Sequence, residues 1–279
     1  MSEKIEINDT GSSSGSVGVA TAEEIRARNI KMWDQLVYIL QKPFRDYGIY
    51  LAEFVGTFIF VFLGTCSIAT TMLDPKFSDL VLLMISFAWG AGLSMGLYVS
   101  AGISGGHLNP AVLGGFSGAA LTFYLFYAKI YQFDGGKRMV IGDKATAGIF
   151  ATYPAAPDTV LRNFLTECLL TVVLVLVGRS FTDKRVNKTN SQGCMELGIL
   201  LFVIALGAGN NTGFALNPAR DFGPRLFTLA AGYGTQVFSA SNYYFWIPIV
   251  GPIFGAIIGY LIYEVLVIPN KYIEQENVV

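Results

Sequence analysis

The sequence predicts an all-α membrane protein that crosses the bilayer several times, and three observations lead to this class. Of the 279 residues, 53% are hydrophobic and only 14% are charged, whereas soluble domains carry roughly 25% charged residues. Six stretches are long apolar runs, and a membrane helix needs about 20 such residues. The tripeptide Asn-Pro-Ala occurs twice, at 109–111 and 217–219. Such a chain cannot cover a globule with polar surface, so it belongs in lipid.

Polar tails are expected on both sides of a membrane domain that covers residues 48–268. Residues 1–47 form the N-terminal tail, whose low-complexity segment TGSSSGSVGVA favours a flexible chain. The stretch 21–41 predicts a short amphipathic helix with Thr21 as its N-cap. We expect a solvated or interfacial tail rather than a docking element. Residues 269–279 form a short C-terminal tail.

Six apolar runs predict six membrane spans, which would place both termini on the same side. Lysine and arginine are densest in the N-terminal tail and in the loop 179–193. Because cytoplasmic loops carry an excess of these residues, both termini are expected in the cytoplasm. The fifth run is short for a span. The runs are 49–73, 80–100, 113–131, 160–178, 194–209 and 245–268.

The two halves of the chain resemble each other, over about 48–131 and 160–268. LAEFVGTF parallels LTECLLTV, which aligns Glu53 with Glu167, and HLNPAV parallels ALNPAR. Each half contains two spans, an Asn-Pro-Ala motif and a further helix. With three spans in each half, the second half starts on the opposite side of the membrane. The repeat is therefore inverted, as in many membrane transport proteins.

Each Asn-Pro-Ala motif is expected to start a helix inside the membrane. Asparagine is a good N-cap and proline suits the first helical position. Two such helices from opposite faces would meet near the midplane with their positive dipole ends, which repel cations. The amides of Asn109 and Asn217 could then donate hydrogen bonds, while the carbonyls of 105–108 and 213–216 accept them. This pattern suits water or a small neutral polyol.

At these motifs the sequence resembles the major intrinsic protein family, the aquaporins and glycerol facilitators, over roughly residues 48–268. Asp221 after Arg220 in NPARDFGPRLF, together with FDGG and GIFATYPAA, is similar to the aquaglyceroporin branch. The resemblance implies a six-span fold with two re-entrant loops and a homotetramer in the plasma membrane. It implies a passive channel for glycerol and similar small neutral solutes, with water as a further candidate solute. It implies no enzyme activity, cofactor or nucleic-acid partner.

The resemblance also assigns roles to individual residues. Asn109 and Asn217 would be midplane donors. Glu53 and Glu167 would hold the two loops, and His107 would line the inner pore. Asp221 is grouped with these loop-supporting and pore-lining residues. The outer constriction would consist of Trp89, Ala205, Phe214 and Arg220. Ala205 falls where the glycerol branch usually has glycine, so it would narrow the constriction.

Two alternatives remain open for these residues. His107 could be an ordinary packed side chain, and since it is the only histidine the sequence predicts no metal site. Glu53 and Glu167 could instead couple proton movement in a secondary transporter. A disulfide framework is not expected from the three cysteines, which all lie in or beside apolar runs.

The first half of the chain has too few residues after its Asn-Pro-Ala motif for both a half-helix and a full span. Only 22 residues separate Asn109 from the end of the third run at Tyr131, against 51 between Asn217 and Ile268. About twenty residues, or about 30 Å of helix, are missing relative to the family pattern, and the expected junction is Val112–Leu113. Either Asn109 lies near the inner face and 113–131 spans the bilayer, or Asn109 reaches the midplane and the third span is truncated. Either way the inner vestibule loses a wall, and a non-conducting variant becomes the alternative function.

Overall fold

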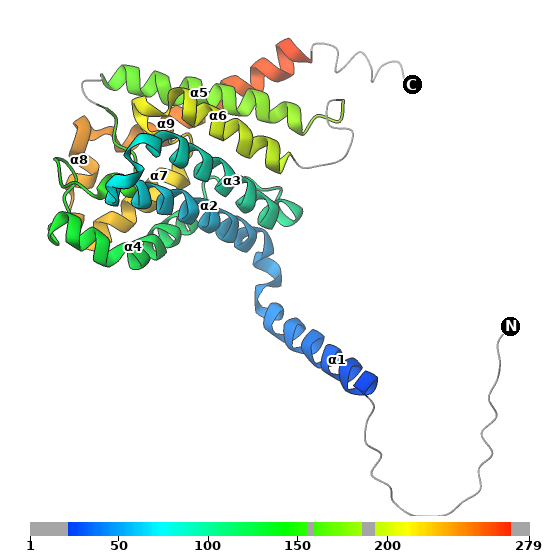
Figure 1. The fold of residues 1–279 in the computed structure, drawn as a ribbon. Helices are drawn as coiled ribbons and strands as arrows, with labels where there is room; N and C mark the ends of the chain where they lie inside the picture. The colour runs from blue at the N-terminus through cyan, green and yellow to red at the C-terminus, as the bar shows by residue number, and fades with distance from the viewer. Residues whose placement is uncertain (1–21, 156–158, 186–192, 269–279) are drawn as a thin grey trace, which may run out of the picture. The chain divides into compact units, whose positions relative to one another are not determined.

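The computed structural model describes residues 22–155, 159–185 and 193–268, which are almost entirely helical and contain no β-strand. It divides into two units between Tyr47 and Gly48. The first unit contains α1 (Ala22–Gln41) and a 3-10 helix (Lys42–Tyr47) (Figure 1). A helix therefore forms where the sequence predicts one. Its expected cap Thr21, the low-complexity segment and the C-terminal tail lie outside the described residues.

The second unit contains the membrane helices. Its α-helices are α2 (Gly48–Leu73), α3 (Val81–Ser104), α4 (Val112–Asp134), α5 (Val160–Phe181), α6 (Cys194–Thr212), α7 (Pro218–Thr228), α8 (Gln236–Tyr243) and α9 (Ile247–Ile262). Its short helices are Pro75–Leu80, Ala147–Ile149, Leu229–Tyr233, Tyr244–Trp246 and Tyr263–Val267. The chain is thus a multi-pass integral membrane protein of the predicted all-α class.

Among the described residues, five helical segments are long and apolar enough to cross a membrane, whereas the sequence predicts six. These segments contain α2, α3, α5, α6 and α9. The missing one is α4, a continuous helix of 23 residues. Its three glycines and its polar side chains, such as Thr122 and Lys129, lower its hydropathy. At 1.5 Å per residue it is still about 34 Å long.

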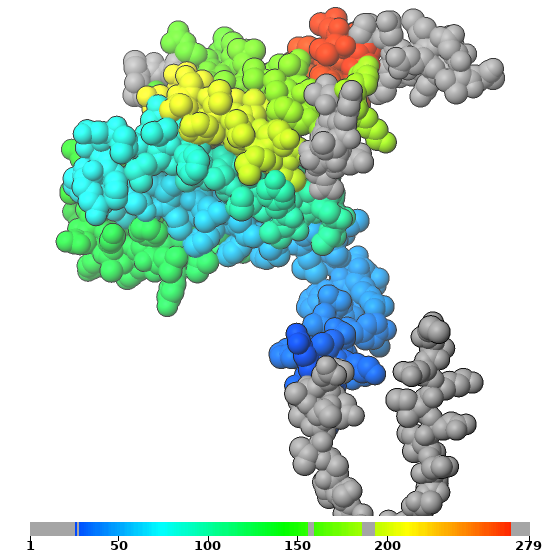
Figure 2. Space-filling view, turned by 45° about the vertical axis from the view of Figure 1, so that its right-hand side comes forward, coloured from blue at the N-terminus to red at the C-terminus, as the bar shows by residue number. Residues whose placement is uncertain are grey.

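The helices of the second unit pack as two related halves. α2 lies between α3 and α4, α5 packs along α9, and α3 meets α6. Figure 2 shows α3 and α6 side by side on one face of the molecule. Two apolar cores result, one around Trp89 and Phe214 and the other around Phe150 and Phe227. The first core surrounds the predicted constriction.

Glycines let α4 approach α2 closely, and Gly118 provides a test. A Cβ atom on Gly118 would lie 2.8 Å from the carbonyl oxygen of Phe58, whereas one on Gly102 of α3 would meet nothing within 4 Å. We expect Gly118→Ala to lower the free energy of unfolding by about 1–3 kcal/mol through overpacking. Gly102→Ala should raise it by about 0.5–1 kcal/mol, because glycine disfavours helix interiors. Thermal unfolding of the purified protein in detergent measures both, and a Gly118→Ala variant as stable as the parent would contradict the packing.

Candidate functional site

The two loops have the same backbone course up to the leucine that precedes each Asn-Pro-Ala motif. α3 ends at Gly105 and α6 ends at Gly213, and both glycines are left-handed, with φ of 90° and 85°. Glycine adopts this conformation without a steric penalty. Further along, Leu108 and Leu216 both have a φ of 51°. The residues before the two motifs therefore repeat the same local conformation.

Two glutamates in equivalent positions hold these loops. Glu53 accepts hydrogen bonds from the backbone N–H groups of His107 (2.9 Å) and Leu108 (2.6 Å). Glu167, which is fully buried, accepts them from Ala215 (3.2 Å) and Leu216 (2.8 Å). A carboxylate that accepts backbone N–H groups turns the carbonyls of the same segment the other way. This arrangement is the one that the family resemblance implies for both glutamates.

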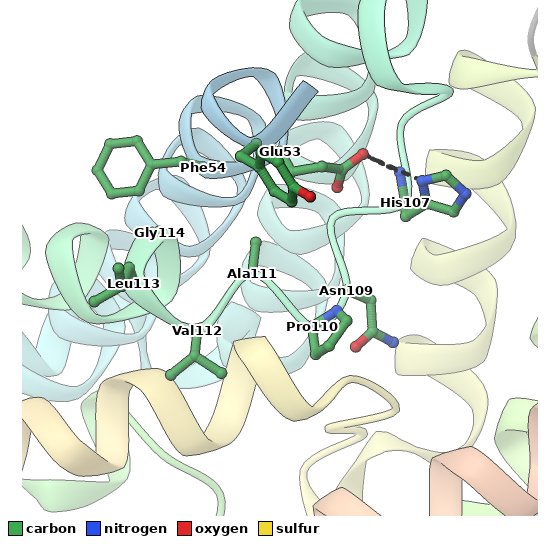
Figure 3. Close-up of a pocket in the computed structure, with 10 residues that line it drawn as sticks. Glu53, Phe54, His107, Asn109, Pro110, Ala111, Val112, Leu113 and Gly114 are labelled. Carbon is green, nitrogen blue, oxygen red and sulfur yellow. Dashed lines mark hydrogen bonds and ion pairs between the residues drawn. The ribbon is translucent and has the colours of Figure 1, made fainter. Parts of the chain in front are cut away.

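His107 lies at the edge of the first loop and is not packed in a core. Its side chain is 70% exposed, and its Nδ1 lies 3.3 Å from Glu53 Oε1. The close-up in Figure 3 shows this pair next to Asn109. Of the two interpretations of His107, pore lining and an ordinary packed side chain, the structure therefore disfavours the packed side chain. His107 and Asn109 both line the inner cavity described below.

The two motifs meet through Asn217. Its Nδ2 donates a hydrogen bond of 2.8 Å to the carbonyl oxygen of Leu108, so this carbonyl already uses one of its two lone pairs. Gly115 of α4 lies directly against the carbonyl of Ala219, where a Cβ would overlap it. The first motif thus lies at the depth of the second. Of the two arrangements left open, this placement favours Asn109 at the midplane and a third span truncated at its inner end.

The two motifs nevertheless start their helices differently. Asn217 caps α7, because its Oδ1 accepts from the N–H groups of Ala219 (2.8 Å) and Arg220 (3.3 Å). The expectation that Asn109 caps a helix in the same way is wrong. α4 begins at Val112 with Ala111 at its N-cap and no side-chain cap. Val112 leads directly into the third span, so the helix follows the direction of that span and leaves the asparagine outside it.

Residues far apart in the sequence gather at the predicted outer constriction. The rings of Trp89 and Phe214 are perpendicular, at 89°, with centroids 6.3 Å apart. The guanidinium carbon of Arg220 lies 4.0 Å from the centroid of the Trp89 ring. Ala205 joins the same apolar cluster but is fully buried. Ala205 is not among the residues that line the outer or the inner cavity described below.

Two cavities lie on either side of this constriction. The outer one, of about 240 Å³, is lined by Phe214, Arg220 and Tyr153 among others. The inner one, of about 190 Å³, is lined by Asn109 and Asn217 among others. No residue lines both cavities.

Several donors at the constriction have no hydrogen-bond partner among the described residues. They are Nε of Arg220, Nε1 of Trp89 and the hydroxyl of Tyr153, all buried. Burial raises the pKa of Tyr153 to about 12, so its hydroxyl keeps its proton at neutral pH. An unpaired buried polar group costs about 1–3 kcal/mol. A hydroxylated molecule or water in this region would remove that cost.

Asp221 supports the outer loop and does not line either cavity. It accepts hydrogen bonds from the N–H group (2.7 Å) and hydroxyl (2.6 Å) of Thr152. Arg225 donates to it through Nε (2.9 Å) and to the Thr152 carbonyl through Nη2 (2.6 Å). Thr152 and Arg225 are not among the residues predicted from the sequence, although the four-residue spacing of Asp221 and Arg225 on one helix face is a recognisable pairing signal.

This network positions the chain beside the constriction. Thr152 lies two residues after Phe150, whose carbonyl accepts a hydrogen bond of 3.4 Å from Nη1 of Arg220. Phe150 itself packs against Phe227 of α7. The outer loop is therefore fixed to the helix that carries the second motif, and it contributes an acceptor for the constriction arginine.

Comparisons with known proteins agree with this site. The family model described as major intrinsic protein matches residues 41–263. Aquaglyceroporin-2 of Rhizophagus irregularis is 39% identical over 92% of this chain and 87% of its own length, and aquaporin-9 of Homo sapiens is 39% identical over 82% and 85%. The X-ray structure of the aquaglyceroporin from Plasmodium falciparum has a TM-score of 0.72 and 27% identity, covering 80% of this chain and 97% of that one.

The alignments are longer than the parts of this chain that they cover. The match to the Rhizophagus protein extends over 282 positions but covers 92% of 279 residues, which is about 257. About 25 of its positions therefore face gaps in this chain. The family model and these relatives cover most of the chain. The chain belongs to the major intrinsic protein family.

Proposed function

We propose that this protein is a passive membrane channel for glycerol and similar small neutral solutes, and that it also passes water. The observation that carries the proposal is the constriction. A perpendicular pair of aromatic rings, Trp89 and Phe214, faces the buried cation Arg220 beside donors that lack partners. Such a site offers an apolar wall to a carbon chain and donors to its hydroxyl groups. The relatives named aquaglyceroporin support the same solute class.

A solute would cross the constriction in a defined orientation. Its carbon backbone would lie in the corner formed by Trp89 and Phe214, and its hydroxyls would accept from Arg220 and Tyr153. A solute bound in this corner would compete with the contact between Arg220 and the Trp89 ring, a cation–π interaction worth about 0.5–2 kcal/mol. Asn217 would then offer its remaining amide hydrogen near the midplane.

The glutamates give no support to proton-coupled transport. Both Glu53 and Glu167 accept hydrogen bonds from two successive backbone N–H groups, and they occupy equivalent positions in the two halves. A carboxylate fully engaged with the backbone orients a loop. In a coupled transporter we would expect a carboxylate that faces the cavity and changes partner during transport.

Stopped-flow light scattering of reconstituted vesicles tests the proposal. Glycerol flux above that of empty vesicles, unchanged by pH or membrane potential, is expected for a channel. Uphill accumulation driven by a proton gradient would overturn it in favour of a secondary transporter. The absence of any flux from folded protein would leave the second candidate, a non-conducting member of the family.

The second candidate is supported by one specific feature of this chain. α4 starts at Val112 and runs directly into the third span, so the segment that relatives have after the first motif is short here. We place the gaps of the alignments at the Val112–Leu113 junction. A non-conducting form could act by assembling with intact subunits. Assembly as a homotetramer, location in the plasma membrane and cytoplasmic termini belong to the channel proposal.

Because the hydroxyl of Tyr153 has no partner among the described residues, its removal should affect solute flux without lowering the stability of the protein. In Tyr153→Phe, a buried donor without a partner disappears, so the free energy of unfolding should stay equal or rise by up to about 1 kcal/mol. Glycerol flux should fall about two- to tenfold, the equivalent of one hydrogen bond. The two measurements are thermal unfolding in detergent and flux in vesicles. If flux were unchanged, Tyr153 would have no contact with the solute.

A further inference from the structure

A third cavity, of about 490 Å³, lies beside the first Asn-Pro-Ala motif (Figure 3). It is the largest of the three cavities described and falls within the range of about 300–1,000 Å³ that is typical of small-molecule sites. Tyr50 and Phe54 of α2 form one wall, and Val112 and Leu113 of α4 form another. The motif itself, from Asn109 onward, forms the floor between them.

The cavity exists because α4 packs closely against α2 only from Gly114 onward. The first close approach of the two helices is at Gly114, where a Cβ would lie 2.5 Å from the carbonyl oxygen of Phe54. The turns of α2 before Phe54 therefore have no α4 alongside them. Tyr50 is 73% exposed and Leu113 is 72% exposed on the two sides of this gap. This is the missing wall that the short spacing after Asn109 predicts.

The walls of the cavity differ in polarity. Glu53, His107 and Asn109 lie on one side, and Phe54, Val112 and Leu113 lie on the other, as Figure 3 shows. The polar side adjoins the inner cavity, because His107 and Asn109 line both cavities. The first loop is thus a thin partition between the inner cavity and the space beyond it.

Water is a poor occupant for the apolar side. A buried water needs two to four polar partners, and Glu53 already accepts from Ser104, His107 and Leu108. Hydrocarbon is close by, since α4 exposes apolar side chains such as Leu125, which is 56% exposed. At membrane depth such a surface faces lipid. A lipid chain can enter from there without crossing water.

We propose that the hydrocarbon chain of a membrane lipid occupies this cavity and replaces the helical segment that is missing after the first motif. The chain packs between Phe54 and the Val112–Leu113 turn, and its presence completes the outer side of the partition at His107 and Asn109. The lipid therefore acts as a structural wall of the inner vestibule. This inference concerns occupancy alone and is tested without measuring solute flux.

A single cysteine at Ala111, whose side chain points into the cavity in Figure 3, tests the occupant. The variant Ala111→Cys is made in a background in which Cys66, Cys168 and Cys194 are serine, and it is reconstituted in phosphatidylcholine vesicles. Reaction with a charged thiosulfonate reagent, present on both sides, reports water. We expect the rate to be at least about tenfold below that of the aqueous control Lys137→Cys and close to that of the hydrocarbon control Leu125→Cys.

A second measurement distinguishes a lipid chain from a protein segment as the occupant of the cavity. The same cysteine variants, labelled with a small bimane fluorophore in detergent, are reconstituted with phosphatidylcholine brominated on its acyl chains. Quenching at position 111 comparable to that at position 125 is expected. A fast reaction with the charged reagent would overturn the proposal in favour of water, and a protected but unquenched site would overturn it in favour of a protein segment. Val112→Cys provides a second position if the first variant does not fold.

Discussion

Replacement of Asp221 by alanine is expected to lower the free energy of unfolding by about 3–5 kcal/mol, the usual cost of breaking a buried ion pair by removing one partner. Asp221 is fully buried and Arg225 is 1% exposed. The change leaves the guanidinium of Arg225 without its carboxylate and the N–H group of Thr152 without its acceptor. The fraction of monodisperse protein in detergent and its thermal unfolding measure the loss.

The double variant Asp221→Leu, Arg225→Met is the control. Replacing a whole buried ion pair with apolar side chains is often neutral or even stabilising. It should therefore recover much of the stability lost in Asp221→Ala, although the Thr152 and Val237 partners of the pair remain unpaired. If the double variant were as unstable as the sum of both single changes, the loss would come from the loop contacts and not from the isolated charge.

The second motif was predictable from the sequence because its signals are local. An N-cap asparagine, a proline at the first helical position and an uninterrupted helix after it occupy successive residues, and α7 begins at Pro218 as these signals require. The first motif has the same three residues, yet its helix begins at Val112. The direction of a helix is set by what it packs against, and the residues after Val112 pack along α2 as the third span does. The tripeptide alone does not contain that information.

The constriction shows a different limit. Trp89 and Arg220 are separated by 131 positions in the sequence, so no spacing rule brings them together, and only the family resemblance predicted their proximity. The resemblance did not predict that Arg220 lies over the Trp89 ring. Nor did it single out Thr152, because a lone threonine in a polar loop carries no periodic or charge signal. Its partner becomes evident only when the loop folds against α7.

The number of residues after the first motif, in contrast, is informative because the length of a helix depends only on geometry. A segment of 22 residues cannot form both a half-helix and a full span at 1.5 Å per residue. The prediction of a lost wall follows from that limit, and the cavity between α2 and α4 lies at the corresponding place. What the sequence left open was whether the shortening displaces Asn109 or truncates the span, and the contact between Asn217 and Leu108 argues for truncation.

The asymmetry of the motifs leads to an expected difference between two matched substitutions, Asn217→Asp and Asn109→Asp. Aspartate keeps the cap of α7 because its oxygen can still accept from Ala219 and Arg220. It cannot donate to the Leu108 carbonyl, now 2.8 Å from Nδ2, and places an oxygen against an oxygen. We expect glycerol flux to fall by at least about tenfold, for a loss of about 1.4 kcal/mol, and the unfolding temperature to fall with it.

Asn109→Asp should lower flux and the unfolding temperature less than Asn217→Asp, because it breaks no hydrogen bond within the described chain and removes no helix cap. Asn109 is exposed and makes no hydrogen bond with the rest of the described chain, and it caps no helix. Flux in vesicles and thermal unfolding in detergent compare the two variants at equal protein content. If both substitutions reduced flux equally, the first motif would act as a midplane donor that contributes as much to flux as the second. If only Asn217→Asp did so, transport would depend on one motif, with the other reduced to a wall of the inner cavity.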